Sequence, residues 1–484
     1  MSKIIKDMNE TVIRETAARC RERGIIIPTF AGLRDPAKIP AGIRERLAGV
    51  GMDDVHPLTL YRITWKNDVR TGLYGPVNAL RLPPAVTGIE ASIVGLVGKH
   101  FPTGSHKVGA AFGCLVPRLV SGEFDPRVHK AVWPSTGNYC RGGAFDCALL
   151  GCHAVAVLPE EMSRERFEWL RAIGAEVIAT PGCESNVKEI YDKCRELSAD
   201  PLYMIFNQFS EFGNAVYHYE VTGPAAEEAF GALRPERGRL AAFVSATGSA
   251  GTIAAGDYLK TLHPLLRIVA AEARQCPTLF LNGFGGHRIE GIGDKHVPWI
   301  HNVRATDALA AIDDEDCLRL LRLFNEEAGH RYLEVLGVSE AERRSLSLLG
   351  ISSLCNLLAA VKAARYFELG REDIILTIFT DSLDFYRSRI EEMRRDRGPY
   401  REVDAARDHA AVIERQGIDW FKELGYADRK AVHNLKYFTW VEQQGKTVEE
   451  LNAQWRPEYW EEIFTQEAAV FDRLIAAFNR EAGL

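Results

Sequence analysis

Three small-residue loops in this chain carry groups that could do chemistry on a small molecule. The loop at residues 103–107 ends in Lys107, and a lysine amine acts as a nucleophile or base once its pKa is lowered from about 10.4. The loop at 135–138 offers hydroxyl and amide groups that can form hydrogen bonds. The loop at 248–252 offers successive backbone N–H groups of the kind that hold a phosphate. Taken singly, each loop is also compatible with an ordinary turn or helix cap.

The loops stand at strand-to-helix junctions of an alternating β–α pattern. Within residues 130–199, three short apolar runs alternate with amphipathic segments, and one of the runs is HAVAVLP at 153–159. A second set of apolar runs includes 240–246, 267–273 and 373–379. Such alternation is typical of parallel sheets with helices packed on their faces. We therefore expect an α/β fold with two parallel-sheet domains, helices on both faces of each sheet, and a cleft between them.

The last part of the chain differs in texture from about residue 394, where a charged, turn-prone stretch gives way to a helical pattern. It contains four of the eight tryptophans: Trp420, Trp440, Trp455 and Trp460. So many large aromatic side chains must be buried, against the core of this chain or against a neighbouring subunit. We predict four segments: 1–100, an N-terminal segment contributing to the large domain; 101–215, a small α/β domain with Lys107 near its start; 216–393, a large α/β domain with the loop at 248–252; and 394–484, a C-terminal helical extension.

Charge and composition narrow the classes of partner. The chain has 59 basic and 66 acidic residues and a net charge of −7, so it has no basic surplus for a nucleic acid or an anionic membrane. A small molecule is the expected partner. The ten cysteines form no CxxC pair, the N-terminus has no apolar leader, and no run of about 18 apolar residues occurs. These features predict a cytoplasmic protein, and no metal-ligand spacing is present, so no metal is expected.

The order of the three loops resembles the pyridoxal-phosphate (PLP) enzymes of the cysteine synthase and cystathionine β-synthase family, fold type II. The connecting sequence supports this over about residues 58–389. QF at 208–209 with HYEVTGP at 218–224 is similar to the family's QF…HYxTTGP, HRIEGIG at 287–293 to HKIQGIG, and GISS at 350–353 to GISS. PTGSHK at 102–107 also resembles the tryptophan synthase β subunit, which shares the fold.

The resemblance implies a role for each loop. Lys107 is expected to be the catalytic lysine that binds PLP covalently, and Asn138 to contact the oxygen on the cofactor ring. The residues expected to hold the cofactor phosphate are Gly248, Ser249, Ala250, Gly251 and Thr252. Those expected to bind the substrate carboxylate are Ser135, Thr136, Gly137, Asn138 and Gln208.

One family position stays open. The family usually places a Ser or Thr hydroxyl at the pyridine nitrogen, and the matching stretch here contains Thr380, Asp381 and Ser382. A carboxylate there would favour a protonated ring and a stronger electron sink, whereas a hydroxyl would not. We expect one of the three to contact the ring nitrogen. Two further departures, Leu354 after GISS and Ala250 in place of a glycine, argue against a routine cysteine synthase.

The resemblance implies β-elimination or β-replacement on a small amino acid such as cysteine, serine or an O-activated serine, through an aminoacrylate intermediate. An alternative is a PLP-dependent dehydratase, ammonia-lyase or racemase of the same fold. A catalytically silent relative that serves in binding or assembly is an alternative of another class. The resemblance further implies a homodimer.

Overall fold

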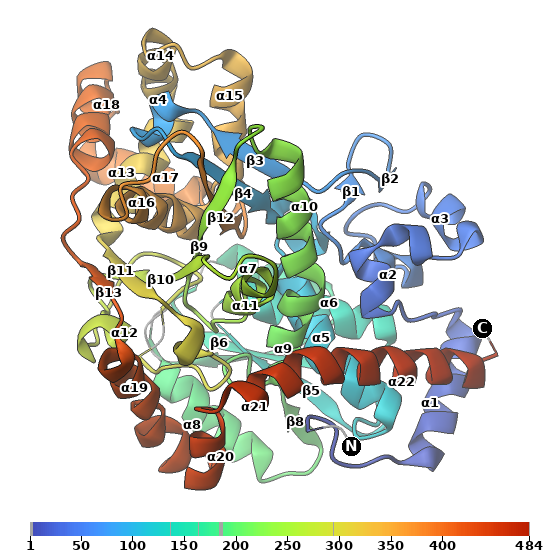
Figure 1. Ribbon diagram of the computed structural model, residues 1–484. Coiled ribbons are helices and arrows are strands. Elements are labelled where there is room, and N and C mark those ends of the chain that lie inside the picture. The colour runs from blue at the N-terminus through green and yellow to red at the C-terminus, as the bar shows by residue number, and fades with distance from the viewer. Residues whose placement is uncertain (1–2, 136, 163, 183–186, 294, 484) are drawn as a thin grey trace.

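The computed structural model of the chain describes residues 3–135, 137–162, 164–182, 187–293 and 295–483. It has the α/β architecture that the sequence predicts, with two parallel-stranded sheets and helices packed around them (Figure 1). The main helices are α1 (Glu10–Arg23), α5 (Lys107–Ser121), α6 (Asn138–Leu150), α7 (Arg164–Ala172), α8 (Val187–Ser198), α9 (Phe212–Tyr217), α10 (Gly223–Leu233), α11 (Ile253–Leu262), α13 (Asp314–Asn325), α14 (Glu327–Val335), α15 (Glu340–Ser345), α16 (Ile351–Tyr366) and α17 (Arg387–Arg397).

The smaller sheet has four strands in the order β7-β6-β5-β8, and all of its pairings are parallel. Its strands are β5 (Lys130–Pro134), β6 (His153–Pro159), β7 (Glu176–Thr180) and β8 (Tyr203–Ile205). The predicted run at 153–159 coincides with β6. Strand β6 is apolar along nearly its whole length because helices cover both faces of a parallel sheet.

The larger sheet has seven strands in the order β13-β11-β10-β9-β12-β4-β3. Its strands are β3 (Ala79–Leu82), β4 (Ser92–Val97), β9 (Arg239–Ala246), β10 (Arg267–Ala273), β11 (Ala308–Ile312), β12 (Asp373–Phe379) and β13 (Phe421–Glu423). The five inner strands run parallel, and only the edge strands β3 and β13 are antiparallel to their neighbours. The first hundred residues therefore supply two strands of this sheet, while the four-segment division stays a prediction.

The C-terminal extension is mainly helical, as expected, but it also supplies a strand. Its helices are α18 (Glu402–His409), α19 (Tyr426–Asn434), α20 (Val448–Ala453), α21 (Pro457–Glu461) and α22 (Glu467–Glu481). Strand β13 pairs with β11 at the edge of the larger sheet. Helix α22 packs on α5 and α1, and α1 also packs on α5, so helices from both ends of the chain lie against α5 (Figure 1).

Two of the four C-terminal tryptophans are buried in this packing. Trp440 is 1% exposed, and its Nε1 donates a hydrogen bond to the Val297 carbonyl at 2.8 Å. Trp460 is 4% exposed and belongs to the same hydrophobic cluster as the α5 residues. The extension thus packs on the core of its own chain.

Among the described residues, no single helix is long and apolar enough to cross a membrane. One sharply bent pair, Glu340–Leu348 with Ile351–Tyr366, reaches that length and composition only when the two helices are taken together.

Candidate active site

Lys107 stands at the first position of α5, directly after a turn that contains the buried residues Ser105 and His106. Its Nζ reaches across to the Ser249 Oγ at 3.4 Å. Burial lowers the pKa of Lys107 from 10.5 to about 8, because the charged ammonium form loses its hydration. A substantial fraction of the amine is therefore neutral, and so nucleophilic, at slightly alkaline pH.

Two adjoining narrow cavities, of about 40 and 20 Å³, meet at Lys107. Both are lined by Lys107, Gly248, Ser249, Gly291 and Ile292. The larger is also lined by Ser135, Gly137, Asn138, Tyr139, Gln208, Phe209 and Gly293. The smaller is also lined by His106, Ser245, Ala246, Ala250, Thr252, Ser352, Asn356, Ile378 and Thr380. The three predicted loops therefore converge on one place from distant parts of the sequence.

The loop at 248–252 connects β9 to the first turn of α11, where backbone N–H groups point away from the helix. Ala250 has a φ of 60°, in the left-handed region that favours glycine, at the position where the resembled family has a glycine. Ser249 Oγ accepts a hydrogen bond from Asn214 Nδ2 at 3.0 Å, which ties the loop to α9. Gly251 lines neither cavity, and its backbone N–H donates to Ser249 Oγ at 3.4 Å.

The loop at 135–138 connects β5 to α6 and forms the opposite wall. Ser135 Oγ accepts hydrogen bonds from the Gly137 N–H at 3.2 Å and from Gln208 Nε2 at 3.5 Å. Together with Asn138, these three residues line the larger cavity. Thr136, which belongs to the substrate-binding prediction, lies outside the described residues.

The structure separates the three candidates for the ring nitrogen. Thr380 lines the smaller cavity, and its Oγ1 lies 3.4 Å from His106 Nε2. Ser382 lines neither cavity, and its hydroxyl donates to the Asp384 carboxylate at 3.2 Å while it caps a short helical turn.

Asp381 also lines neither cavity and points to the neighbouring helix ends instead. Its Oδ2 accepts hydrogen bonds from Asn138 Nδ2 at 2.7 Å and from the Tyr386 hydroxyl at 2.8 Å. Asp381 is 1% exposed, and burial raises its pKa to about 6. Asp381 therefore contacts the site only through its hydrogen bond to Asn138, which lines the larger cavity.

A second set of contacts links α7 to α17 through Glu290. Glu290 accepts from Arg166 Nη2 at 2.6 Å and from Arg389 Nε at 2.7 Å. Arg166 belongs to α7 beside the smaller sheet, whereas Arg389 belongs to α17. Glu290 directly precedes Gly291, which lines both cavities. This ion-pair network therefore links the cavity wall to α7 and to α17.

Sequence reasoning gave no role to two polar residues that line the smaller cavity. His106 and Ser352 are 1% and 2% exposed, and among the described residues His106 Nδ1 and Ser352 Oγ have no hydrogen-bond partner. Burial and the neighbouring Lys107 keep the pKa of His106 well below its usual value, so its imidazole is neutral. The sequence could have indicated both residues: His106 directly precedes Lys107, and Ser352 belongs to the GISS motif.

Comparison with known proteins gives a consistent result. The family model described as "pyridoxal-phosphate dependent enzyme" matches residues 98–381, more than half of the chain. A cysteine synthase from Staphylococcus aureus is 29% identical over 319 residues, which cover 66% of this chain and 94% of that protein.

Two solved structures are similar in both fold and sequence. A hydrogen sulfide-producing enzyme from Fusobacterium nucleatum has a TM-score of 0.54 and 25% identity, covering 64% of this chain and 95% of that one. An O-acetylserine-dependent cystathionine β-synthase from Helicobacter pylori has a TM-score of 0.54 and 25% identity, covering 65% and 95% of the two chains. The chain belongs to the family of pyridoxal-phosphate-dependent enzymes, and its cofactor is PLP.

The residues at the cavities fit this cofactor chemically. The buried amine of Lys107 suits an aldehyde, and the backbone N–H groups of the loop before α11 suit a phosphate. His106 Nδ1 and Ser352 Oγ, which have no partner among the described residues, suit a polar ring. The cavities are narrow, so the side chains that line them must move apart to admit the ring.

Proposed function

We propose that the protein catalyses β-elimination or β-replacement on a serine-type amino acid with PLP as cofactor. The observation that carries the proposal is the position of Lys107: its amine has a pKa of about 8 and stands between the loop at 248–252 and the loop at 135–138. Similarity to cysteine synthase and to an O-acetylserine-dependent enzyme supports the choice of substrate class.

Lys107 has two tasks in this proposal. It holds the cofactor covalently in the resting enzyme, and it takes the Cα proton of the amino acid during the reaction. When bound, PLP supplies the electron sink for the charge left at Cα. The substituent on Cβ then leaves with its bonding electron pair, and either a nucleophile adds to Cβ or the remainder is released. The low pKa of Lys107 suits the amine to accept a proton near neutral pH.

Ser135, Asn138 and Gln208 are proposed to bind the substrate carboxylate, with the second N–H of the Asn138 amide left for the cofactor ring oxygen. The hydrogen bond from Asn138 Nδ2 to Asp381 supports this orientation, because it fixes one amide hydrogen away from the cavity. Ser135 and Gln208 are 8% and 7% exposed, so a carboxylate bound between them would be largely shielded from water.

The loop of Gly248, Ser249, Ala250, Gly251 and Thr252 is proposed to hold the phosphate through its backbone N–H groups at the start of α11. Thr380 is proposed to contact the ring nitrogen, because it lines the cavity whereas Asp381 and Ser382 do not. A hydroxyl at this place does not force protonation of the ring, which suits elimination at Cβ.

We also propose a homodimer, which rests on resemblance to the family, and the four-segment domain division, which rests on the pattern of the sequence. Light scattering on the purified protein would give the mass of the particle directly. A monomeric mass would rule out the dimer.

The test of function uses the purified holoenzyme with O-acetylserine, cysteine and serine in turn. Release of acetate, sulfide or pyruvate with conversion of at least one substrate is expected, and the Lys107→Ala variant should lose at least 10³-fold in rate. Lys188→Ala is the matched control, because Lys188 is an exposed lysine on α8 and should keep full activity. Racemisation at Cα with the Cβ substituent retained would contradict the proposed reaction.

A further inference from the structure

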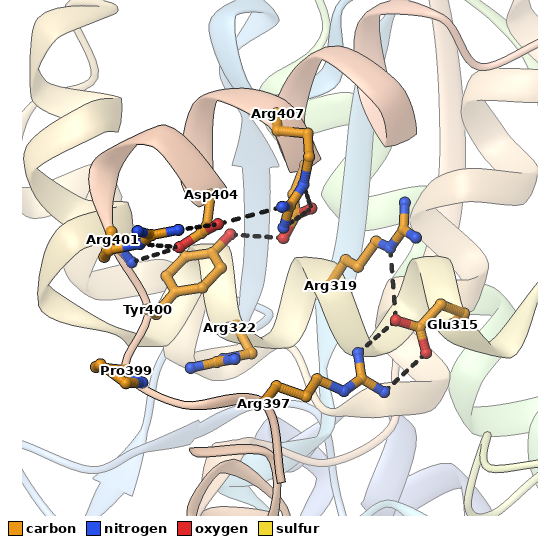
Figure 2. A pocket seen from close by; sticks show the side chains of 10 residues that line it. Glu315, Arg319, Arg322, Arg397, Pro399, Tyr400, Arg401, Asp404 and Arg407 are labelled. Carbon is orange, nitrogen blue, oxygen red and sulfur yellow. Dashed lines mark hydrogen bonds and ion pairs between the residues drawn. The ribbon is translucent and has the colours of Figure 1, made fainter. Parts of the chain in front are cut away.

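A second, larger cleft lies away from the catalytic cavity, between α13 and the segment at 397–408 (Figure 2). Its volume is about 660 Å³, which is in the range of small-molecule sites. None of its lining residues lines the catalytic cavities. One wall belongs to the family region that ends at residue 381, whereas the other wall comes from the residues beyond it. The cleft is therefore formed only where this chain continues past the family core.

The cleft is positively charged in a protein that is acidic as a whole. Five arginines line it: Arg319, Arg322, Arg397, Arg401 and Arg407. Three carboxylates line it: Glu315, Asp404 and Asp408. The lining alone gives 5 − 3 = +2. Outside the lining, Glu326 pairs with Arg322 on one oxygen and with Arg394 on the other, which adds one charge of each sign and leaves the sum unchanged.

The carboxylates hold the arginine side chains in place but leave donors free. In Figure 2, Arg397 and Arg319 both turn toward Glu315, while Arg401 and Arg407 turn toward the carboxylates of α18. Among the described residues, Arg319 contacts Glu315 through Nε alone at 3.5 Å, so both of its terminal nitrogens remain available. Arg401 uses Nε and Nη2 on Asp404, which leaves Nη1. Free guanidinium donors thus come from both walls.

Arg322 and Tyr400 are held in place within the lining of the cleft by contacts of their own. Arg322 is 5% exposed, its Nη2 donates to the Gly398 carbonyl at 3.0 Å, and its guanidinium lies 4.7 Å from the centre of the Tyr400 ring. The Tyr400 hydroxyl donates to Asp408 at 3.0 Å. A cation and an aromatic ring fixed in this way need no reordering when a ligand binds, which lowers the entropic cost of binding.

We propose that this cleft binds a small polyanion that carries two or more linked phosphate groups. Guanidinium groups recognise phosphate through paired hydrogen bonds, and donors on two facing walls suit a chain of phosphates better than a single one. The ligand chemistry is shared by inorganic polyphosphates and nucleoside polyphosphates.

Glu315 connects this cleft to the catalytic cavity. One of its oxygens is held by Arg397 Nη2 at 2.9 Å on the cleft side, and the same oxygen is held by Arg288 Nη2 at 3.1 Å on the other. Arg288 is also tied to Asp314 and stands three residues before Gly291, which lines both catalytic cavities. A polyanion that draws Arg397 toward itself would weaken its hold on Glu315, so binding should be sensed at the Gly291 loop.

The test is calorimetric titration of the holoenzyme with tripolyphosphate and, separately, with ATP, in low salt without divalent metal. Both should bind with sub-millimolar affinity, and the affinity should fall as salt is raised from 50 to 500 mM. The double variant R319Q/R401Q should bind at least tenfold more weakly. R371Q is the control, because Arg371 is an exposed arginine that pairs with a carboxylate, Glu90, and lies outside the cleft; it should bind as the wild type does.

Equal affinity for the two ligands would identify the phosphate chain alone as the recognised group, whereas tighter ATP binding would add the nucleoside; either supports the proposal. Absence of binding by both ligands, or wild-type affinity in R319Q/R401Q, would overturn it. The cofactor absorption band should also shift when tripolyphosphate saturates the holoenzyme. An unchanged band at saturation would overturn the connection through Glu315.

Discussion

Asp381 accepts a hydrogen bond from Asn138 across the cavity wall, with 2.7 Å between Oδ2 and Nδ2. The two residues are 243 positions apart in the sequence, and they come from the ends of different sheets. A buried carboxylate therefore sets the direction of the amide that is proposed to face the cofactor. The carboxylate acts through Asn138 and touches neither catalytic cavity.

Replacement of Asp381 should separate its hydrogen-bonding role from its charge. Asp381→Ala removes the acceptor for both Asn138 and Tyr386, so PLP affinity should fall about tenfold, or about 1.4 kcal/mol. Asp381→Asn keeps an accepting oxygen and should stay within about threefold of wild type. Fluorescence titration of the apoprotein with PLP measures both. Asp384→Ala is the control, because Asp384 is half-exposed and lies three residues away; equal affinity in Asp381→Ala and wild type would contradict the role.

The same carboxyl predicts a pH dependence of stability. Burial raises its pKa from 3.8 to about 6, so the folded protein holds this proton in a range where the unfolded chain has lost it. Its contribution to stability therefore falls as pH rises from about 4 to about 6, by about 3 kcal/mol in total. Asp381→Asn lacks this titration. In urea unfolding, the free energy of unfolding of the variant should therefore rise relative to that of the wild type between pH 4 and pH 7. A difference independent of pH would show that the pKa is not raised.

Gly350 packs against the side chains of Asp381 and Tyr386. A Cβ at this position would lie 1.9 Å from Asp381 Oδ1 and 2.7 Å from Tyr386 Cε2. Its backbone has an ordinary φ of −75°, so steric overlap alone is the obstacle to alanine. Gly350→Ala should lower the free energy of unfolding by about 1–3 kcal/mol and weaken PLP binding. Gly231→Ala has open space around its Cβ and serves as the control; matched stability of the two variants would contradict the packing argument.

The lowered pKa of Lys107 predicts how fast the apoprotein takes up PLP. The neutral amine is the reactive form, and its fraction rises as pH increases through the pKa of about 8. The rate of reconstitution should therefore climb between pH 7 and pH 9 and then level off. Stopped-flow absorbance measures it, with free lysine as the reference amine. A rate that still climbs in parallel with free lysine toward pH 10 would show that burial does not lower the pKa.

Much of the fold follows from local pattern. Strands β6, β10 and β12 begin and end where the apolar runs predict, because buried parallel strands are apolar along their length. The edge strands β3 and β13 were not predicted. The three residues Phe421–Glu423 have no pattern of their own and become a strand only because β11 offers an open edge.

The site divides in the same way. Lys107, the 135–138 loop and the 248–252 loop are visible in the sequence because each sits at a strand-to-helix junction. The choice among Thr380, Asp381 and Ser382 is not visible, because it depends on which distant group each side chain meets: His106 for Thr380, Asn138 for Asp381, and only the local turn for Ser382.

The most direct test of the account is to find the residue that carries the cofactor. Borohydride reduction of the holoenzyme fixes PLP to the lysine that holds it, and peptide mass spectrometry then locates the added mass. The account predicts a single modified lysine, Lys107, and no modification in Lys107→Ala. Attachment at another lysine, or a wild-type protein that takes up no PLP, would contradict it.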